Sequence, residues 1–274
     1  MDSLPDTSGP SRKARKRRRW KGFARWRKRG RALGRRLMAV PSALRIVVVA
    51  AAVVAVLMMA NLLYHVVHKP TEMLFPVSGR LSKAPAETWG AYGPLFQKYS
   101  TGTITPELLA ALAQTESAGN PVARTYWRWR LTWNPFAIYA PASSAVGMYQ
   151  MTDPAFAEAR RYCIRQHAVV EDGCWLTSLY VRVLPRHAVE LAAIYLDRGV
   201  APVLAGLPGV AATSQQKQDL AALIHLCGAG PAKNFVRRGF RPLVGERCGD
   251  HSVAAYLAKV NAMKREFLRL AAER

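Results

Sequence analysis

The sequence predicts a mainly α-helical fold, in which one membrane-spanning helix precedes a helical domain. Residues 46–63 form an almost unbroken run of Val, Ala, Leu and Met, and with its flanks this run reaches the roughly 20 residues that cross a bilayer as a helix. Later segments repeat apolar residues at helical spacing and carry capping residues at their ends. We therefore divide the chain into a basic tail (1–44), an anchor (45–67), a spacer (68–86) and a helical domain (87–274).

The basic tail gives the chain much of its net charge of +23, because sixteen of the 40 Lys and Arg residues lie in positions 1–45. Trp20, Phe23 and Trp26 are interleaved with them, so nucleic-acid binding is one interpretation. The adjacent apolar run favours another, since basic residues before a spanning helix follow the positive-inside rule and bind anionic lipid. We expect a cytoplasmic N-terminus, a domain outside the cytoplasm, and no nucleic-acid partner.

A cleaved signal peptide is the competing interpretation of residues 1–67. Its charged region would be far longer than usual, and its apolar region exceeds the typical ~7–15 residues. No good small-x-small cleavage site follows the apolar run. The sequence therefore favours an uncleaved anchor.

The most informative stretch is residues 108–152. Thr105 can cap a helix whose first residue is Pro106. Glu116 lies one turn beyond the apolar stripe of this helix, at a position where the pattern calls for an apolar side chain. Burial there disfavours the ionised carboxylate, so Glu116 is a candidate proton donor. The stripe consists of Leu108, Leu109, Leu112 and Ala113.

These residues carry a family resemblance. Glu-Ser at 116–117, Gly-Asn-Pro at 119–121 and a Gly-x-x-Gln turn at 147–150 resemble the soluble lytic transglycosylase (SLT) domain of the lysozyme-like superfamily. The resemblance covers roughly residues 87–270 and implies a lysozyme-like helical fold. It makes Glu116 the catalytic acid and base. It places substrate binding on Ser117, Gly147, Met148, Tyr149 and Gln150.

The reaction implied by the resemblance is cleavage of peptidoglycan between N-acetylmuramic acid and N-acetylglucosamine. Glu116 would protonate the glycosidic oxygen and then accept the proton of the muramoyl 6-hydroxyl, which closes a 1,6-anhydro ring without water, metal or cofactor. Most glycosidases need a second carboxylate, and Asp153 and Glu158 are the acids nearby in sequence. Asp153 precedes Pro154 in the manner of a helix N-cap, so we interpret it as structural.

An aromatic segment separates the two signatures. We hypothesise that at least one of Trp127, Trp129 and Trp133 packs against sugar rings; the alternative is that these rings fill the core under a long loop. Arg124, Arg128 and Arg130 would meet the carboxylates of peptide stems.

The C-terminal part both matches and departs from the family pattern. Residues 252–270 predict a helix, and Tyr256 in AYLAKV resembles a family tyrosine that points toward the catalytic carboxylate; the alternative is a core tyrosine. Residues 225–231 (HLCGAGP) are similar to the family's Tyr-Asn-Ala-Gly-Pro segment. Cys227 and Gly228 replace its Tyr and Asn, so Tyr149 or His225 would have to support Glu116. Further departures are Pro141 and Ser144.

Four cysteines, Cys163, Cys174, Cys227 and Cys248, all follow the anchor. An even count in an oxidising compartment predicts two disulfides, and three pairings are possible. We favour nearest-neighbour pairing over free thiols, and over a metal site, because the chain has no Cys-x-x-Cys.

The resulting prediction is a lytic transglycosylase held in the bacterial inner membrane by a single pass, with its domain in the periplasm. Its partners would be peptidoglycan strands, the membrane, and a secretion or conjugation machine that must open the wall. The alternatives are a lysozyme-type hydrolase and a catalytically weak wall-binding component of such a machine.

Overall fold

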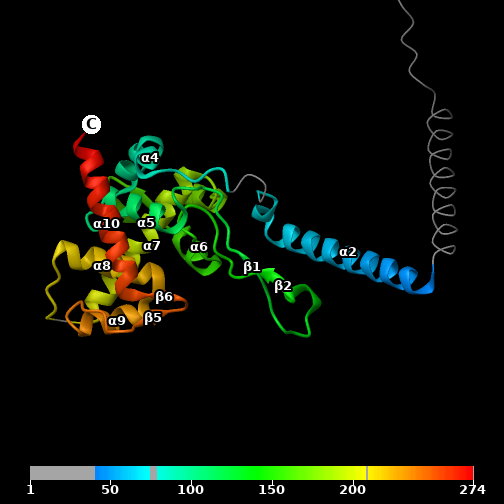
Figure 1. Cartoon of the computed structure of the whole chain (residues 1–274). Coiled ribbons are helices and arrows are strands. Elements are labelled where there is room, and N and C mark those ends of the chain that lie inside the picture. Colours follow the sequence, from blue (N-terminus) through cyan, green and yellow to red (C-terminus); the bar gives the residue numbers. More distant parts are fainter. Residues whose placement is uncertain (1–40, 75–78, 208, 274) are drawn as a thin grey trace, which may run out of the picture. The chain divides into compact units, whose positions relative to one another are not determined.

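The computed structural model describes residues 41–74, 79–207 and 209–273. The chain forms two compact units, an N-terminal unit that ends at Leu63 and a C-terminal unit from Tyr64 onward. The described residues contain eight α-helices and three short two-stranded sheets, so the predicted mainly α-helical class is confirmed (Figure 1). Positions 1–40 of the predicted basic tail lie outside the described residues.

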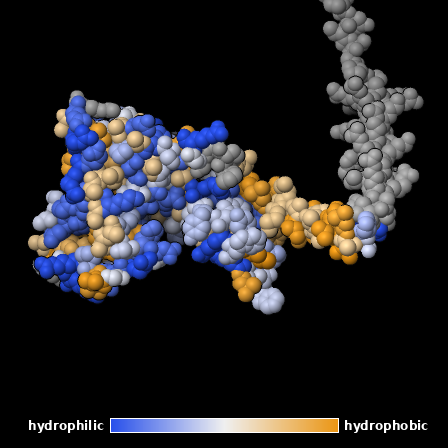
Figure 2. Space-filling model, viewed as in Figure 1, coloured by the Kyte–Doolittle hydropathy of each residue, from blue (hydrophilic) through white to orange (hydrophobic). Residues whose placement is uncertain are grey.

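The first described helix, α2 (Ser42–His68), is long and apolar enough to cross a membrane. The mean hydropathy of its most apolar 18-residue window is 2.8, and almost all its side chains are exposed. Figure 2 shows it as a nearly continuous hydrophobic surface. The sequence therefore correctly predicted one long apolar helix near the N-terminus.

The C-terminal unit is built from helices with three hairpins between them (Figure 1). The α-helices are α4 (Pro85–Tyr99), α5 (Pro106–Ser117), α6 (Asp153–Ala159), α7 (Pro185–Ala205), α8 (Ser214–Cys227), α9 (Ala229–Arg237) and α10 (Val253–Ala272). Short 3-10 helices are η1 (Pro70–Leu74), η2 (Pro135–Ala137) and η3 (Trp175–Leu179). The antiparallel hairpins pair β1 (Trp127–Trp129) with β2 (Tyr139–Pro141), β3 (Cys163–Arg165) with β4 (Ala168–Val170), and β5 (Arg247–Cys248) with β6 (His251–Ser252).

Helix α5 lies at the centre of this unit and packs against α4, α7 and α10. Thr105 caps it as predicted, since its Oγ1 accepts a hydrogen bond from the Leu108 amide at 3.4 Å. The predicted stripe is buried, but Ala110 and Ala111 are fully buried as well. Helices therefore cover α5 on more than one side, and its small alanines permit their close approach.

Two local predictions need correction. Asp153 is the first residue of α6 and not its N-cap; Thr152 holds the cap position without a side-chain hydrogen bond. Asp153 instead forms an ion pair with Arg182, with 2.6 Å between Oδ1 and Nη2. Within the predicted spacer, residues 70–74 form the helix η1, and the Glu72 side chain is buried. The hydrophobic pattern gave no signal for η1 because its role in packing is polar.

The predicted cysteine pairing is confirmed. Cys163 is bonded to Cys174, and Cys227 is bonded to Cys248. The first bond closes the β3–β4 segment, and the second joins the end of α8 to β5. Both disulfides are consistent with a domain outside the cytoplasm.

Candidate active site

Glu116 lies in the last turn of α5, and two side chains from other helices contact its carboxylate. The Tyr256 hydroxyl of α10 donates a hydrogen bond to Glu116 Oε1 at 2.6 Å. His225 Nε2, from α8, lies 3.6 Å from the same oxygen and can form an ion pair when its imidazole is protonated. The Glu116 side chain is only 18% exposed. Three helices that are distant in sequence thus converge on one half-buried acid.

Helix α10 sets the position of Tyr256. Ser252 caps this helix by accepting a hydrogen bond from the Ala255 amide at 3.4 Å, and Val253, Val260 and Phe267 are buried in the core. Burial and the neighbouring Glu116 carboxylate raise the pKa of the Tyr256 hydroxyl well above its usual value. The hydroxyl therefore remains a neutral donor at physiological pH.

A cavity of about 570 Å³ opens beside Glu116. Its walls come from four parts of the chain: the end of α5, the segment 124–126 with Gln150, Leu226 of α8, and the region from the β5–β6 turn into α10. Two cationic residues, Arg124 and Lys259, and two acids, Glu116 and Asp250, line it. A cavity of this volume with mixed polar walls suits a hydroxyl-rich ligand such as a sugar.

The turn at residues 147–150 is built on glycine. Gly147 has φ of +83°, and a Cβ there would lie 2.4 Å from the Arg182 carbonyl oxygen. The Gly147 amide donates to the Ala123 carbonyl at 2.7 Å. Gln150, also at positive φ (45°), donates from Nε2 to the Gly147 carbonyl at 3.0 Å and lines the cavity. The turn thus presents Gln150 to the space beside Glu116.

A comparison with known families adds to this geometry. Residues 94–203 match the family described as the Transglycosylase SLT domain. The chain contains a transglycosylase SLT domain. Such a domain implies peptidoglycan binding and cleavage of the lytic transglycosylase type. No curated protein matches the chain.

The SLT match covers only part of the site. Glu116 and the 147–150 turn fall inside it, whereas His225 and Tyr256 lie beyond its last matched residue. The expected extent of the resemblance, residues 87–270, is therefore wider than the matched range. The contacts that α8 and α10 make with Glu116 therefore come from the structure and not from the family match.

Three other residues of the two signatures lie in or beside the core of the domain. Met148 and Tyr149 are buried, and burial raises the pKa of the Tyr149 hydroxyl well above its usual value. Ser117 donates from Oγ to the Met148 carbonyl at 2.8 Å and so joins α5 to the turn. None of these three side chains lines the cavity. Of the two candidate substitutes for the family tyrosine, His225 is the one that reaches Glu116.

The aromatic segment contributes one aromatic side chain to the cavity wall. Tyr126 lines it, whereas Trp127, Trp129 and Trp133 do not. Trp127 donates from Nε1 to Glu72 at 2.8 Å, and Trp129 stacks on Tyr139. The sugar-platform hypothesis for the three tryptophans stays a prediction. Among the three predicted arginines, only Arg124 lines the cavity.

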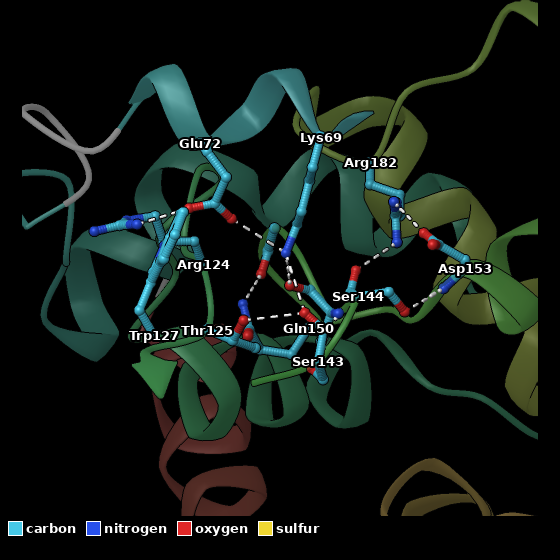
Figure 3. A network of polar contacts seen from close by, with 12 residues as sticks. Lys69, Glu72, Arg124, Thr125, Trp127, Ser143, Ser144, Gln150, Asp153 and Arg182 are labelled. Carbon is cyan, nitrogen blue, oxygen red and sulfur yellow. Dashed lines mark hydrogen bonds and ion pairs between the residues drawn. The ribbon is translucent and has the colours of Figure 1, made fainter. Parts of the chain in front are cut away.

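A polar network holds the segments around the turn (Figure 3). The buried Glu72 carboxylate pairs with Arg124 at 2.7 Å and with Lys69 at 3.3 Å. Lys69 also donates to the backbone carbonyls of Ser143 and Ala145 at 3.2 and 3.3 Å. Burial lowers the pKa of Lys69, and the charge of Glu72 opposes that effect. Residues just after α2 therefore support the loop that leads to Gly147.

Sequence reasoning missed the part of the site contributed by the β5–β6 hairpin. Asp250 and His251 line the cavity, while Asp153 and Glu158, the acids considered from sequence, do not. The available signal was the pairing of Cys227 with Cys248. That bond joins the end of α8 to β5, two residues before Asp250, and it could have pointed to Asp250.

Replacing Tyr256 by Phe is expected to lower the rate of muropeptide release roughly 10- to 100-fold. A hydrogen bond to a charged group contributes about 1.5–3 kcal/mol, and each 1.36 kcal/mol is about tenfold in rate. The melting temperature should change little because the ring remains in place. Initial rates on purified sacculi and a thermal melt check this. A wild-type rate in Y256F would assign the tyrosine to the core alone.

Proposed function

We propose that this chain is a membrane-anchored lytic transglycosylase that cleaves the N-acetylmuramic acid–N-acetylglucosamine bond and leaves 1,6-anhydro-muramoyl ends. The observation that carries the proposal is the Glu116 carboxylate at the edge of a cavity, with the Tyr256 hydroxyl 2.6 Å from one of its oxygens. Helix α2 would hold the protein in the bacterial inner membrane, with the N-terminus in the cytoplasm. The catalytic unit would then lie in the periplasm.

The contacts of Glu116 give its two carboxylate oxygens different roles. Within the described part of the chain, Tyr256 and His225 both contact Oε1. Oε2 is therefore the oxygen left for the substrate. In the proposed reaction, a proton on Oε2 passes to the glycosidic oxygen as the bond breaks. Oε2 then accepts the proton of the muramoyl 6-hydroxyl, whose oxygen bonds to C1 and closes the anhydro ring.

Tyr256 makes this exchange possible at a single acid. Its donated hydrogen bond stabilises the carboxylate form that exists after the first proton transfer. The raised pKa of Tyr256 keeps its own proton in place throughout. The tyrosine therefore orients the carboxylate and does not exchange protons with the sugar.

Asp250 supports a second candidate function. A lysozyme-type hydrolase needs a second carboxylate, and Asp250 lines the same cavity as Glu116. Its side chain is exposed, as expected for a residue that could activate water. The hydrolase is therefore the alternative that the structure supports.

Digestion of purified sacculi by the full-length protein in detergent separates the two reactions. We expect products whose mass is lower by one water than that of reducing-end muropeptides, because the anhydro ring forms without hydrolysis. The matched variant Asp250→Asn should give the same products at a similar rate. Reducing ends from the wild type, lost in D250N, would establish the hydrolase and overturn the transglycosylase.

A further inference from the structure

The β1–β2 hairpin ends in large side chains that are exposed within the described part of the chain. Trp129 is 66% exposed, and Leu131 and Trp133, in the connection between the strands, are exposed to 108% and 103%. In Figure 2 a small orange patch lies beside the pale free end of the hairpin. Soluble proteins rarely expose neighbouring large apolar groups without a partner. We therefore expect the free end of the hairpin to contact a partner.

The base of the hairpin is fixed to residues that directly follow the apolar run. His65 Nε2 is 2.8 Å from the Phe136 carbonyl oxygen, and the Tyr64 and Phe136 rings stack with centroids 4.4 Å apart. The His65 ring meets the Trp127 ring edge-on at 5.0 Å. The hydrogen bond from Trp127 to Glu72 adds a further contact. The hairpin is thus held against residues 64–72.

The position of residues 64–65 in the chain indicates where the hairpin lies relative to the membrane. The apolar run ends at Leu63, so with α2 across a bilayer Tyr64 and His65 lie at the headgroup level. Because the hairpin base contacts these two residues, it lies at that level as well. Trp133 is six residues beyond Trp127, and at about 3.3 Å per residue it lies within roughly 20 Å of the base.

The composition of the hairpin fits this location. Residues 126–142 contain Arg128 and Arg130 but no acidic residue, so the hairpin is attracted to anionic headgroups. Tryptophan is enriched at membrane–water interfaces because its ring is apolar and its N–H is polar. Neither Trp129 nor Trp133 lines the cavity beside Glu116. Chain continuity and charge both favour lipid over a glycan or a protein.

We propose that the β1–β2 hairpin is an interfacial membrane anchor: Trp129, Leu131 and Trp133 insert into the leaflet at which α2 ends, and Arg128 and Arg130 bind its headgroups. The proposal rests on α2 being the membrane anchor, and it is independent of the reaction at Glu116. The hairpin and α2 together give the catalytic unit two points of attachment. A single flexible tether would leave its orientation free.

Tryptophan fluorescence in vesicles tests the proposal. The full-length protein, with the tail residues Trp20 and Trp26 changed to Phe, is reconstituted into phosphatidylethanolamine–phosphatidylglycerol vesicles that contain lipids brominated high in the acyl chain. We expect bromine to quench the emission, and the variant Trp129→Ala/Trp133→Ala to lose most of the quenched component. Trp175→Ala is the matched control, because Trp175 is 76% exposed outside the hairpin; its quenched component should be unchanged.

Flotation of the vesicles separates the two parts of the proposal. Protein that fails to float with the lipid would overturn both the anchor role of α2 and the hairpin insertion. If the protein floats but W129A/W133A retains all the quenched component, the hairpin does not insert. Full quenching of Trp129 and Trp133 by aqueous acrylamide in vesicles would indicate a protein-facing or free surface. Protection by peptidoglycan fragments in detergent would indicate the glycan platform, and either result overturns insertion.

Discussion

Replacing Glu116 by Gln is expected to lower muropeptide release from purified sacculi by about 10²–10⁴-fold, the usual contribution of a general acid–base group. The amide keeps the shape of the side chain and can still accept the Tyr256 hydrogen bond, but it cannot give a proton to the glycosidic oxygen. Folding should therefore be preserved. Chromatography with mass spectrometry measures the release, and a thermal melt verifies the fold.

Glu158→Gln is the matched control for this loss. Glu158 carries the same charge and lies exposed on α6, and it does not line the cavity. Its variant should keep wild-type activity. Undiminished release by E116Q would remove Glu116 from the reaction. If E116Q lost release but still supported assembly of an envelope machine in cells, the wall-binding role would be separable from cleavage.

Replacing Gly147 by Ala is expected to lower the free energy of unfolding by roughly 2–4 kcal/mol, from the combined cost of a strained backbone and overpacking. The added Cβ would lie 2.4 Å from the Arg182 carbonyl and 3.3 Å from that of Pro121. Both contacts are backbone atoms, so no side chain can rotate to relieve them. The turn must shift, and Gln150 moves with it. Urea denaturation of the full-length protein in detergent measures the change.

Gly102→Ala provides the comparison for this strain. A Cβ at Gly102 meets nothing within 4 Å, and its φ lies outside the range that favours glycine. The G102A variant should retain wild-type stability and activity. Equal stability of G147A and the wild type would show that the turn can relax, and it would contradict the tight packing described for residues 121, 147 and 182.

Much of the fold followed from local rules in the sequence. The cap at Thr105, Pro106 at the first position and the apolar stripe define α5 almost to the residue, because capping and burial act over a few neighbouring positions. The capping box formed by Thr213 and Gln216 is another local signal, and it marks the start of α8. The two disulfides could also be predicted from the sequence, because each joins cysteines that are close in sequence.

The sequence did not reveal contacts that polar groups make over long separations. Nothing near Glu72 signals that its carboxylate will be buried between Lys69 and Arg124, 52 residues away. No local pattern marks Asp250 as a site residue, and the fold brings it to the cavity. Asp153 appeared to be a helix cap because capping and a distant ion pair favour the same short acid. Tyr256 was found only through a family resemblance, since an aromatic residue on an apolar helix face normally indicates core.

The bond between Cys227 and Cys248 links two walls of the cavity beside Glu116. It joins the strand before Asp250 to the helix turn that carries His225 and Leu226. In a newly made chain with free thiols, only noncovalent packing holds these two pieces together. In the proposed location outside the cytoplasm, oxidation would fix them, so the cavity beside Glu116 would be completed after export. Without the bond, the two walls would be free to separate, and the proposed active site would be held less firmly.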